Sequence, residues 1–227
     1  MALNLTRNFE NGALIAVWKL EEPEPFFLER LRLEPFEQAE LEGIKGHRRL
    51  ERLASRHLLF ELQKMAGGIF PPERIPIWKD EFGKPHFLAE KNPGGWNISY
   101  SHSREMVAAA ISPGSVGIDV QHFVSKIATI APKFMREEEL KCLQKATAVE
   151  QLHLFWAAKE AMYKAHGRRQ LDFRQHIITE PFEYLPGQPG VFKGTVFKDD
   201  FFGSYQLAYE QIGEYFLVTG TAVERDF

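Results

Sequence analysis

The chain contains little cysteine and no long apolar run. Cys142 is the single cysteine among 227 residues. An intrachain disulfide and a cysteine-rich zinc site are therefore excluded, and the thiol suits packing in a reducing compartment. No apolar stretch approaches the roughly 18 residues of a membrane span. The first residues also lack the charged and then apolar pattern of a secretory signal. We therefore expect a cytoplasmic protein that does not cross a membrane.

The chain also lacks a strong excess of either charge. Its net charge of −3 argues against a general nucleic-acid binder, although local patches are compatible with it. At 227 residues it has room for one large domain or two small ones, each with its own core. No repeat of roughly 20 to 50 residues is visible, and a turn at Pro113 and Gly114 marks the midpoint. We predict two halves, residues 1–112 and 113–227.

The strongest helical pattern lies in residues 152–167. At about 100° per residue, one side of this helix is apolar and the other is polar or aromatic. The apolar side holds Leu154, Phe155, Ala158, Ala161, Met162 and Ala165, and the other side holds Trp156, Lys159, Glu160, Tyr163 and Lys164. Thr147 and Glu150 have the spacing of a capping box, and Gly167 stands where a left-handed residue ends a helix. We predict that the apolar side packs and that the other side carries function.

Glu160 and Lys164 are separated by one turn on the polar side of this helix. Their Cβ atoms would be about 5–6 Å apart, so a carboxylate and an ammonium group would project side by side. A surface ion pair of small effect on stability is one interpretation of this spacing. A functional pair is the other, and the helical pattern alone does not decide between them.

A second helical pattern runs from Glu37 to Met65 and carries a stripe of cations. One arc of about 100° holds Lys45, Arg48, Arg49, Arg52 and Arg56. A solvated helix face explains such a stripe most simply. However, only Glu51 offers an opposite charge within its span, so the cations repel one another unless an anion lies among them. A phosphate-rich ligand would relieve that repulsion.

Short strand patterns make up much of the remaining sequence. They cover Ala13 to Leu20, Trp96 to Ser103, Met106 to Ile111 and Ser115 to Gln121, and further antiparallel strands follow residue 190. A short helix is predicted from Pro132 to Gln144. Asp119 interrupts an apolar strand, and a buried acid is costly unless it is paired or bound to a metal ion. It is therefore the carboxylate that most needs a partner.

Two polar segments precede that strand. Ser101-His102-Ser103 ends one strand pattern and offers hydroxyl and imidazole groups to an anion. Gly83-Lys84-Pro85 has the composition of a turn that would hold Lys84 in a defined place. A simple turn without function is the more frequent meaning of such a segment.

Taken in order, these motifs resemble the 4′-phosphopantetheinyl transferases of the surfactin-synthetase type. The resemblance rests on Gly117-Ile118-Asp119-Val120, on Trp-Ala-Ala-Lys-Glu-Ala-Met-Tyr-Lys at residues 156–164, and on the two upstream segments. It covers the chain from about Lys45 to Gly167. Each motif is modest alone, whereas their order and spacing are together specific.

The resemblance implies a fold and a reaction. The fold would be α+β, with two similar, pseudo-twofold related subdomains that each pack a small, mainly antiparallel sheet on helices. Coenzyme A would bind in the cleft between the halves of a monomer. Its 4′-phosphopantetheine group would pass to a serine of an apo acyl or peptidyl carrier protein, with release of adenosine 3′,5′-bisphosphate, as in a holo-[acyl-carrier-protein] synthase. Mg²⁺ is the implied metal ion, with Mn²⁺ as a substitute.

The resemblance also assigns roles to residues. Asp119 and Glu160 would bind Mg²⁺, and Glu160, Lys164 and His102 would be catalytic. Coenzyme A would be contacted by Arg48, Arg49, Arg56, Gly83, Lys84, Pro85, Ser101, His102 and Lys164. In this set the arginines would meet the 3′-phosphate, the Gly83 segment the adenine, and the Ser101 segment and Lys164 the other phosphates. Glu160, directly or through water, would take the serine proton.

Gln121 departs from the pattern of the family, because many bacterial members carry a third acid at this position. An amide oxygen binds Mg²⁺ weakly or holds a water, and Mg²⁺ usually keeps several waters. A site with two carboxylates therefore still suffices, with Gln121 as a weak or water-mediated ligand.

Docking of the carrier protein and two other functions stay open at this point. Apolar residues after the Asp119 strand would either receive the carrier protein or belong to the core; they are Val124, Ile127, Ile130, Phe134 and Met135. A non-catalytic coenzyme A or nucleotide binder that kept the fold is one alternative, motivated by Gln121. A Mg²⁺-dependent phosphodiesterase is another, but no residue favours the water attack that it requires.

Overall fold

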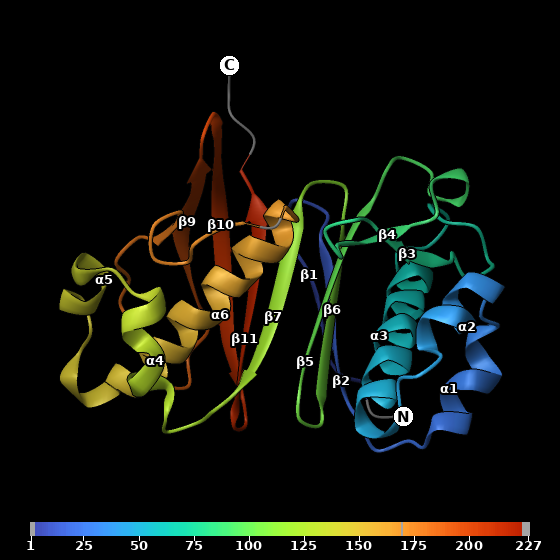
Figure 1. Ribbon diagram of the computed structural model, residues 1–227, viewed down its shortest axis with the longest axis horizontal. Coiled ribbons are helices and arrows are strands. Elements are labelled where there is room, and N and C mark those ends of the chain that lie inside the picture. The colour runs from blue at the N-terminus through green and yellow to red at the C-terminus, as the bar shows by residue number, and fades with distance from the viewer. Residues whose placement is uncertain (1–2, 169, 224–227) are drawn as a thin grey trace. The chain divides into compact units, whose positions relative to one another are not determined.

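The computed structural model describes residues 3–168 and 170–223. The chain divides into two compact units, Met1–Gly114 and Ser115–Phe227, which Figure 1 colours continuously by residue number. The predicted boundary between residues 112 and 113 lies in the turn just before this division. In the described part of the chain, every helix is too short or too polar to span a membrane.

The first unit packs helices on a four-stranded antiparallel sheet. The strand order is β1 (Leu3–Asn8), β2 (Leu14–Lys19), β6 (Met106–Ser112) and β5 (Asn97–Ser103). The long helix α3 (Gly46–Met65) lies on this sheet, and α1 (Glu24–Leu31) packs on α3 (Figure 1). Trp18, Phe27, Leu58 and Val107 belong to the core between them. A hairpin of β3 (Ile77–Lys79) and β4 (Pro85–Phe87), followed by η1 (Ala89–Lys91), completes the unit.

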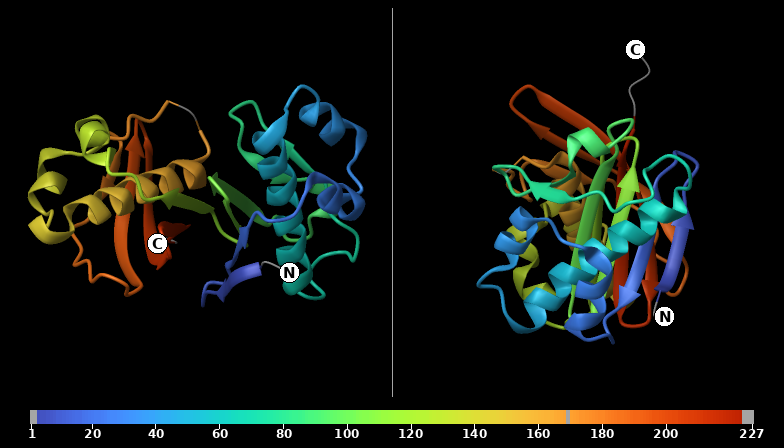
Figure 2. Two further views of the ribbon diagram at one scale, coloured as in Figure 1. Left: turned by 90° about the horizontal axis from the view of Figure 1, so that it is seen from below. Right: turned by 90° about the vertical axis from the view of Figure 1, so that its right-hand side faces the viewer.

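The second unit packs one long helix on a five-stranded antiparallel sheet. The strand order is β7 (Val116–His122), β11 (Tyr215–Ala222), β10 (Phe201–Ile212), β9 (Gly190–Lys198) and β8 (Ile177–Thr179). Helix α6 (Ala148–His166) runs along one face of the sheet (Figure 2). The short elements α4 (Ile127–Phe134), α5 (Glu137–Lys141) and η2 (Lys145–Thr147) precede it. The predicted α+β class is confirmed, whereas the twofold relation between the halves stays a prediction.

Two predicted helices are divided in the structure. The segment from Glu37 to Met65 forms α2 (Pro35–Leu41) and α3 rather than one helix. Gly43 and Gly46 between them take left-handed conformations with φ of 79° and 59°, which an α-helix does not accommodate. The segment from Pro132 to Gln144 likewise contributes to two helices, since Pro132 lies inside α4 and α5 begins at Glu137.

The named strand predictions each coincide with a strand, whereas β1, β3, β4 and β8 were not predicted. Strands β9, β10 and β11 all begin at or after Gly190, as predicted. The C-terminal antiparallel strands are therefore confirmed as part of the sheet that carries α6.

Candidate active site

Strand β7 places Asp119 beneath helix α6. Asp119 is only 5% exposed, and strand alternation puts Gly117, Asp119 and Gln121 on the same face. A Cβ atom at Gly117 would overlap the carbonyl oxygen of Ala161 and lie 2.7 Å from the amide nitrogen of Ala165. Helix α6 therefore lies directly on the strand because Gly117 has no side chain. Side chains from the helix can thus reach the acid on the strand.

Helix α6 brings Lys164 to Asp119. The Nζ atom of Lys164 lies 2.7 Å from Oδ1 of Asp119 and donates to the carbonyl of Ile118 at 3.1 Å. The surface Glu160–Lys164 pair considered from the sequence is not the ion pair that forms, because Lys164 pairs with the buried acid. Half-buried Glu160 lies one helical turn before Lys164. Two acids and one ammonium group therefore belong to the same site.

The electrostatics of Glu160 show that the two acids act on each other. Burial, followed in size by the negative charge of Asp119, raises the pKa of Glu160 to about 7 from an ordinary value of 4.5, although Lys164 acts in the opposite direction. A carboxyl group with this pKa is partly protonated near neutral pH. A cation bound between the two acids would favour the charged form of both.

The donor atoms on this face fit a hard divalent cation. Asp119 and Glu160 supply carboxylate oxygens, and Gln121 directs its Nε2 to the carbonyl of His122 at 3.1 Å, so its amide oxygen is the atom left to serve as a ligand. Within residues 3–168 and 170–223, no group of three or more His, Cys, Asp or Glu side chains could hold a metal ion. A third protein ligand would therefore be an amide or backbone oxygen, and Mg²⁺ commonly completes such sites with water.

The ends of α6 are partly as predicted. Gly167 takes the left-handed conformation with φ of 73° and donates its N–H to Tyr163, so the predicted stop is confirmed. The helix begins after Thr147, but the predicted capping box is wrong because the Thr147 side chain makes no cap hydrogen bond. Its hydroxyl instead donates to the side chain of Gln144 at 3.0 Å.

Lys159 was predicted to lie on the functional side of α6, and this prediction is wrong. The side chain is fully buried. Its Nζ donates to Glu139 Oε2 and to the carbonyls of Phe134, Phe173 and Ile177 at 2.8–3.0 Å. Lys159 therefore ties α6 to the segments that cover it. No sequence pattern indicates this role, because the acceptors come from four separate places in the chain.

Ser101 and His102 are neighbours on β5 of the first unit, and their side chains lie on opposite faces of the strand. His102 faces α3, where its Nδ1 lies 3.1 Å from Oε1 of Glu51. Ser101 is buried. The strand therefore does not present both side chains in the same direction, and their joint contact with phosphate stays a prediction.

Two of the three predicted phosphate-binding arginines have carboxylate partners. Arg56 is 2% exposed and pairs with Glu37 and Glu40 of α2. The Nε atom of Arg49 lies 2.7 Å from Glu24 of α1. The argument that the stripe lacks nearby anions is therefore wrong, because α1 and α2 supply them.

Of the other cations in the stripe, Arg48 is exposed. Arg52, which no assignment included, donates to the Tyr100 hydroxyl at 3.1 Å. The break between α2 and α3 is what brings the carboxylates to α3, and the sequence pattern did not reveal it.

The Gly83-Lys84-Pro85 segment forms the tight turn between β3 and β4. Asp80 holds it by accepting the backbone N–H of Phe82 at 3.0 Å and of Lys84 at 2.9 Å. Gly83 has φ of 84°, which favours glycine. Burial lowers the pKa of Lys84. Lys84 is thus held in a defined place, as predicted, and its contact with adenine stays a prediction.

The residues considered for carrier docking divide between core and partial exposure. Ile127, Phe134 and Met135 are buried in one cluster with Leu152 and Phe155, so for these three the core interpretation holds. Val124 and Ile130 are partly buried against the same cluster.

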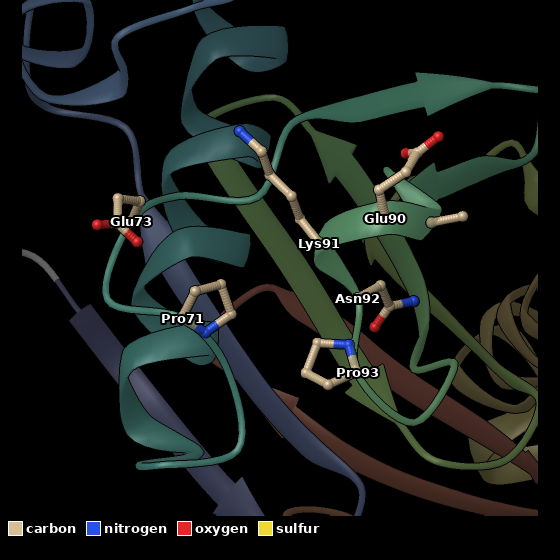
Figure 3. A pocket seen from close by; sticks show the side chains of 7 residues that line it. Pro71, Glu73, Glu90, Lys91, Asn92 and Pro93 are labelled. Carbon is tan, nitrogen blue, oxygen red and sulfur yellow. The ribbon is translucent and has the colours of Figure 1, made fainter.

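A pocket in the first unit is lined by residues that were not predicted to belong to the site. It has a volume of about 470 Å³ and is lined by Pro71, Glu73, Ala89, Glu90, Lys91, Asn92 and Pro93 (Figure 3). Its lining comes from η1 and from the loop that follows α3. None of the predicted site residues lines this pocket. The pocket therefore adds nothing to the assignment of the site.

Comparison with known proteins supports the resemblance inferred from the sequence. Residues 115–219 match the family model of the 4′-phosphopantetheinyl transferase superfamily. This range contains Asp119, Gln121, Glu160 and Lys164, and with them the whole site built by β7 and α6. The match therefore supports the predicted family on the residues that hold the two acids.

Two curated relatives match parts of the chain. The 4′-phosphopantetheinyl transferase gsp of Aneurinibacillus migulanus is 37% identical over 101 residues, which cover 43% of this chain and 40% of that protein. The protein slr0495 of Synechocystis sp., provisionally named a 4′-phosphopantetheinyl transferase, is 24% identical over 125 residues, or 51% and 50% of the two chains. The chain thus spans about half of the length of these relatives, or less.

Proposed function

We propose that this chain, whose C-terminal half belongs to the 4′-phosphopantetheinyl transferase superfamily, transfers 4′-phosphopantetheine from coenzyme A to a serine of an apo carrier protein. Adenosine 3′,5′-bisphosphate is the second product. The observation that carries the proposal is the Asp119–Lys164 pair beside Glu160, at the place where Gly117 lets α6 lie on β7. Two acids and an ammonium group suit a diphosphate and its counter-ion.

Asp119 and Glu160 would hold Mg²⁺, with Gln121 as a weak ligand or one that acts through water. Mn²⁺ also accepts such oxygen ligands. When bound, the metal ion supplies charge neutralisation at the diphosphate oxygens. The raised pKa of Glu160 supports this assignment, because burial and the charge of Asp119 oppose the ionisation of Glu160, and a bound cation would favour it.

Lys164 and His102 would stabilise charge on the substrate. The ammonium group of Lys164 is fixed by Asp119 and Ile118, so it can meet the negative charge that grows on the departing phosphate without reorganisation. His102 would donate a further hydrogen bond to a phosphate oxygen. Ser101, Arg48 and the Lys84 turn keep their predicted places as contacts of coenzyme A.

Glu160 is the candidate group for removing the serine proton, directly or through a water. A general base must be deprotonated when it acts, and a divalent cation held by Asp119 and Glu160 would favour the charged form of Glu160. A serine oxygen that loses its proton to Glu160 would attack the β-phosphorus, and the bond to the leaving bisphosphate would break.

The test is incubation of the full chain with coenzyme A, Mg²⁺ and a panel of apo acyl and peptidyl carrier proteins, followed by mass spectrometry of the carriers. We expect a mass gain equal to one phosphopantetheinyl group. Glu160→Gln should abolish the gain, whereas Glu183→Gln, at an exposed position of the same unit, should preserve it. A preserved gain in Glu160→Gln would contradict the assigned role of Glu160.

A non-catalytic coenzyme A binder is the alternative that one observation favours, namely Gln121 in place of a third acid. Binding of coenzyme A by calorimetry with no carrier modified would support it. Free phosphopantetheine without carrier modification would instead indicate hydrolysis. The monomeric state and the cytoplasmic location stay predictions.

A further inference from the structure

Glu51 of α3 is a buried carboxylate whose partners are imidazoles. It is 8% exposed, and its Oε1 lies 3.1 Å from Nδ1 of His102 on β5 and 3.4 Å from Nε2 of His47 on α3. Among residues 3–168 and 170–223, no lysine or arginine forms an ion pair with Glu51. A buried carboxylate is costly without such donors, so the imidazoles are what make its burial tolerable.

This choice of partner is notable because arginines flank Glu51 on the same helix. Arg49 pairs with Glu24, Arg52 donates to Tyr100, and Arg56 pairs with Glu40. Each of these cations is thus directed to another group. Glu51 is therefore paired with histidines even though arginines lie close to it on the same helix.

His47 has a nearer acceptor than Glu51. Its Nε2 lies 2.7 Å from the carbonyl oxygen of Arg104, the residue with φ of 52° in the turn between β5 and β6. The ring therefore donates to that carbonyl and holds the turn. His102 is the closer of the two imidazoles to Glu51, and its Nδ1 lies 3.1 Å from the carboxylate oxygen.

We infer that Glu51 is a positioning residue for His102. Because its Oε1 lies 3.1 Å from Nδ1, it holds the orientation of the ring that the proposed function places against a phosphate of coenzyme A. A neighbouring carboxylate also favours the charged imidazolium, in which both nitrogens are donors. Carboxylates orient histidines in this way in catalytic triads and behind metal-bound imidazoles. The inference rests on the proposed function, in which His102 contacts coenzyme A.

The kinetic test compares the wild type with Glu51→Gln, Glu51→Asp and His102→Ala. Glu51→Gln should raise the KM for coenzyme A roughly tenfold, with a smaller change in kcat. It should also move the basic limb of the kcat/KM profile to lower pH, because the imidazolium loses its stabilising anion. Glu51→Asp keeps the charge and should retain the wild-type limb. A wild-type KM and limb in Glu51→Gln would overturn the inference.

Two controls separate positioning from general destabilisation. In the His102→Ala background, Glu51→Gln should have no further effect, because a positioning residue acts through its partner; an additional loss would overturn the inference. Glu61→Gln removes another half-buried acid of α3, one that pairs with Lys64 at 2.6 Å. This variant should keep the wild-type KM and pH profile, and a change equal to that of Glu51→Gln would count against a specific role of Glu51.

A spectroscopic arm tests the inference without any activity. In the ¹⁵N-histidine spectrum of the full chain, the His102 ring should stay doubly protonated to higher pH in the wild type than in Glu51→Gln, because only the carboxylate favours the imidazolium. An equal pH range in the two proteins would overturn the positioning role. If the wild type modifies no carrier protein, the proposed function fails, while this comparison still decides the role of Glu51.

Discussion

Replacing Glu160 by glutamine should stabilise the protein in the absence of divalent cations. Burial and the charge of Asp119 raise the pKa of this carboxyl group from 4.5 to about 7. Between these pH values the folded chain binds more protons at Glu160 than the unfolded chain does. The free energy of unfolding therefore falls as pH rises across this window, and the full cost is present above about pH 7.

The magnitude follows from the size of this change in pKa. Each pH unit corresponds to about 1.4 kcal/mol, so ionising Glu160 in the folded chain costs about 3 kcal/mol at pH 8. Glutamine has nearly the same shape and no charge, and it removes this cost. For a chain of this length, the gain corresponds to a rise in Tm of up to roughly 6–12 °C.

The assay is thermal unfolding of wild type and Glu160→Gln with a chelator present, at pH 8 and at pH 5. We expect the variant to be more stable at pH 8 and similar to the wild type at pH 5. Adding Mg²⁺ at pH 8 should raise the Tm of the wild type more than that of the variant, because binding to the folded state stabilises it. Glu183→Gln should match the wild type throughout. Equal stability at pH 8, or a gap that is the same at both pH values, would refute the reasoning.

Three other predictions concern the same site. Gly117→Ala should lower the free energy of unfolding by several kcal/mol and abolish transfer, because the methyl group must displace the backbone of α6 at Ala161. Denaturant unfolding and the carrier assay test this prediction. A fully active variant would contradict the close packing of α6 on β7. Lys164→Ala should lower kcat more than coenzyme A affinity, as single-turnover kinetics and calorimetry would reveal; the reverse pattern would assign Lys164 to binding alone. Gln121→Glu should keep activity and tighten Mg²⁺ binding in a metal titration, whereas loss of activity would give the amide a specific role.

The local patterns in the sequence were sufficient for the elements of the site. An acid within an apolar strand identified Asp119 and its need for a partner, and the 3.6-residue period identified α6 with its stop at Gly167. These signals are local, because they depend on neighbours in the sequence. The partner of Asp119 was not predicted, because Lys164 is 45 residues away in the sequence. The sequence pattern instead offered Glu160, on the same helix, as the partner of Lys164.

The carboxylate partners of buried cations could not be predicted from the sequence. Arg56 was read as part of an exposed stripe, yet it is buried against Glu37 and Glu40 because Gly43 and Gly46 end one helix and begin another. Lys159 was placed on the functional side of α6, yet it is buried with Glu139. In both cases the acceptors come from other elements, so helical periodicity alone gives the face of a charge and not its partner.

The treatment of buried acids across the molecule supports the location of the site. Burial raises the pKa of Glu37, but Arg74 and backbone donors outweigh this and hold the pKa below the ordinary value. Glu139 has Lys159 and Thr179 as donors. Glu160 differs from both, because burial and a second acid raise its pKa. A fold that satisfies its other buried carboxylates tolerates this cost only if something outside the chain relieves it, and a divalent cation with a diphosphate does so.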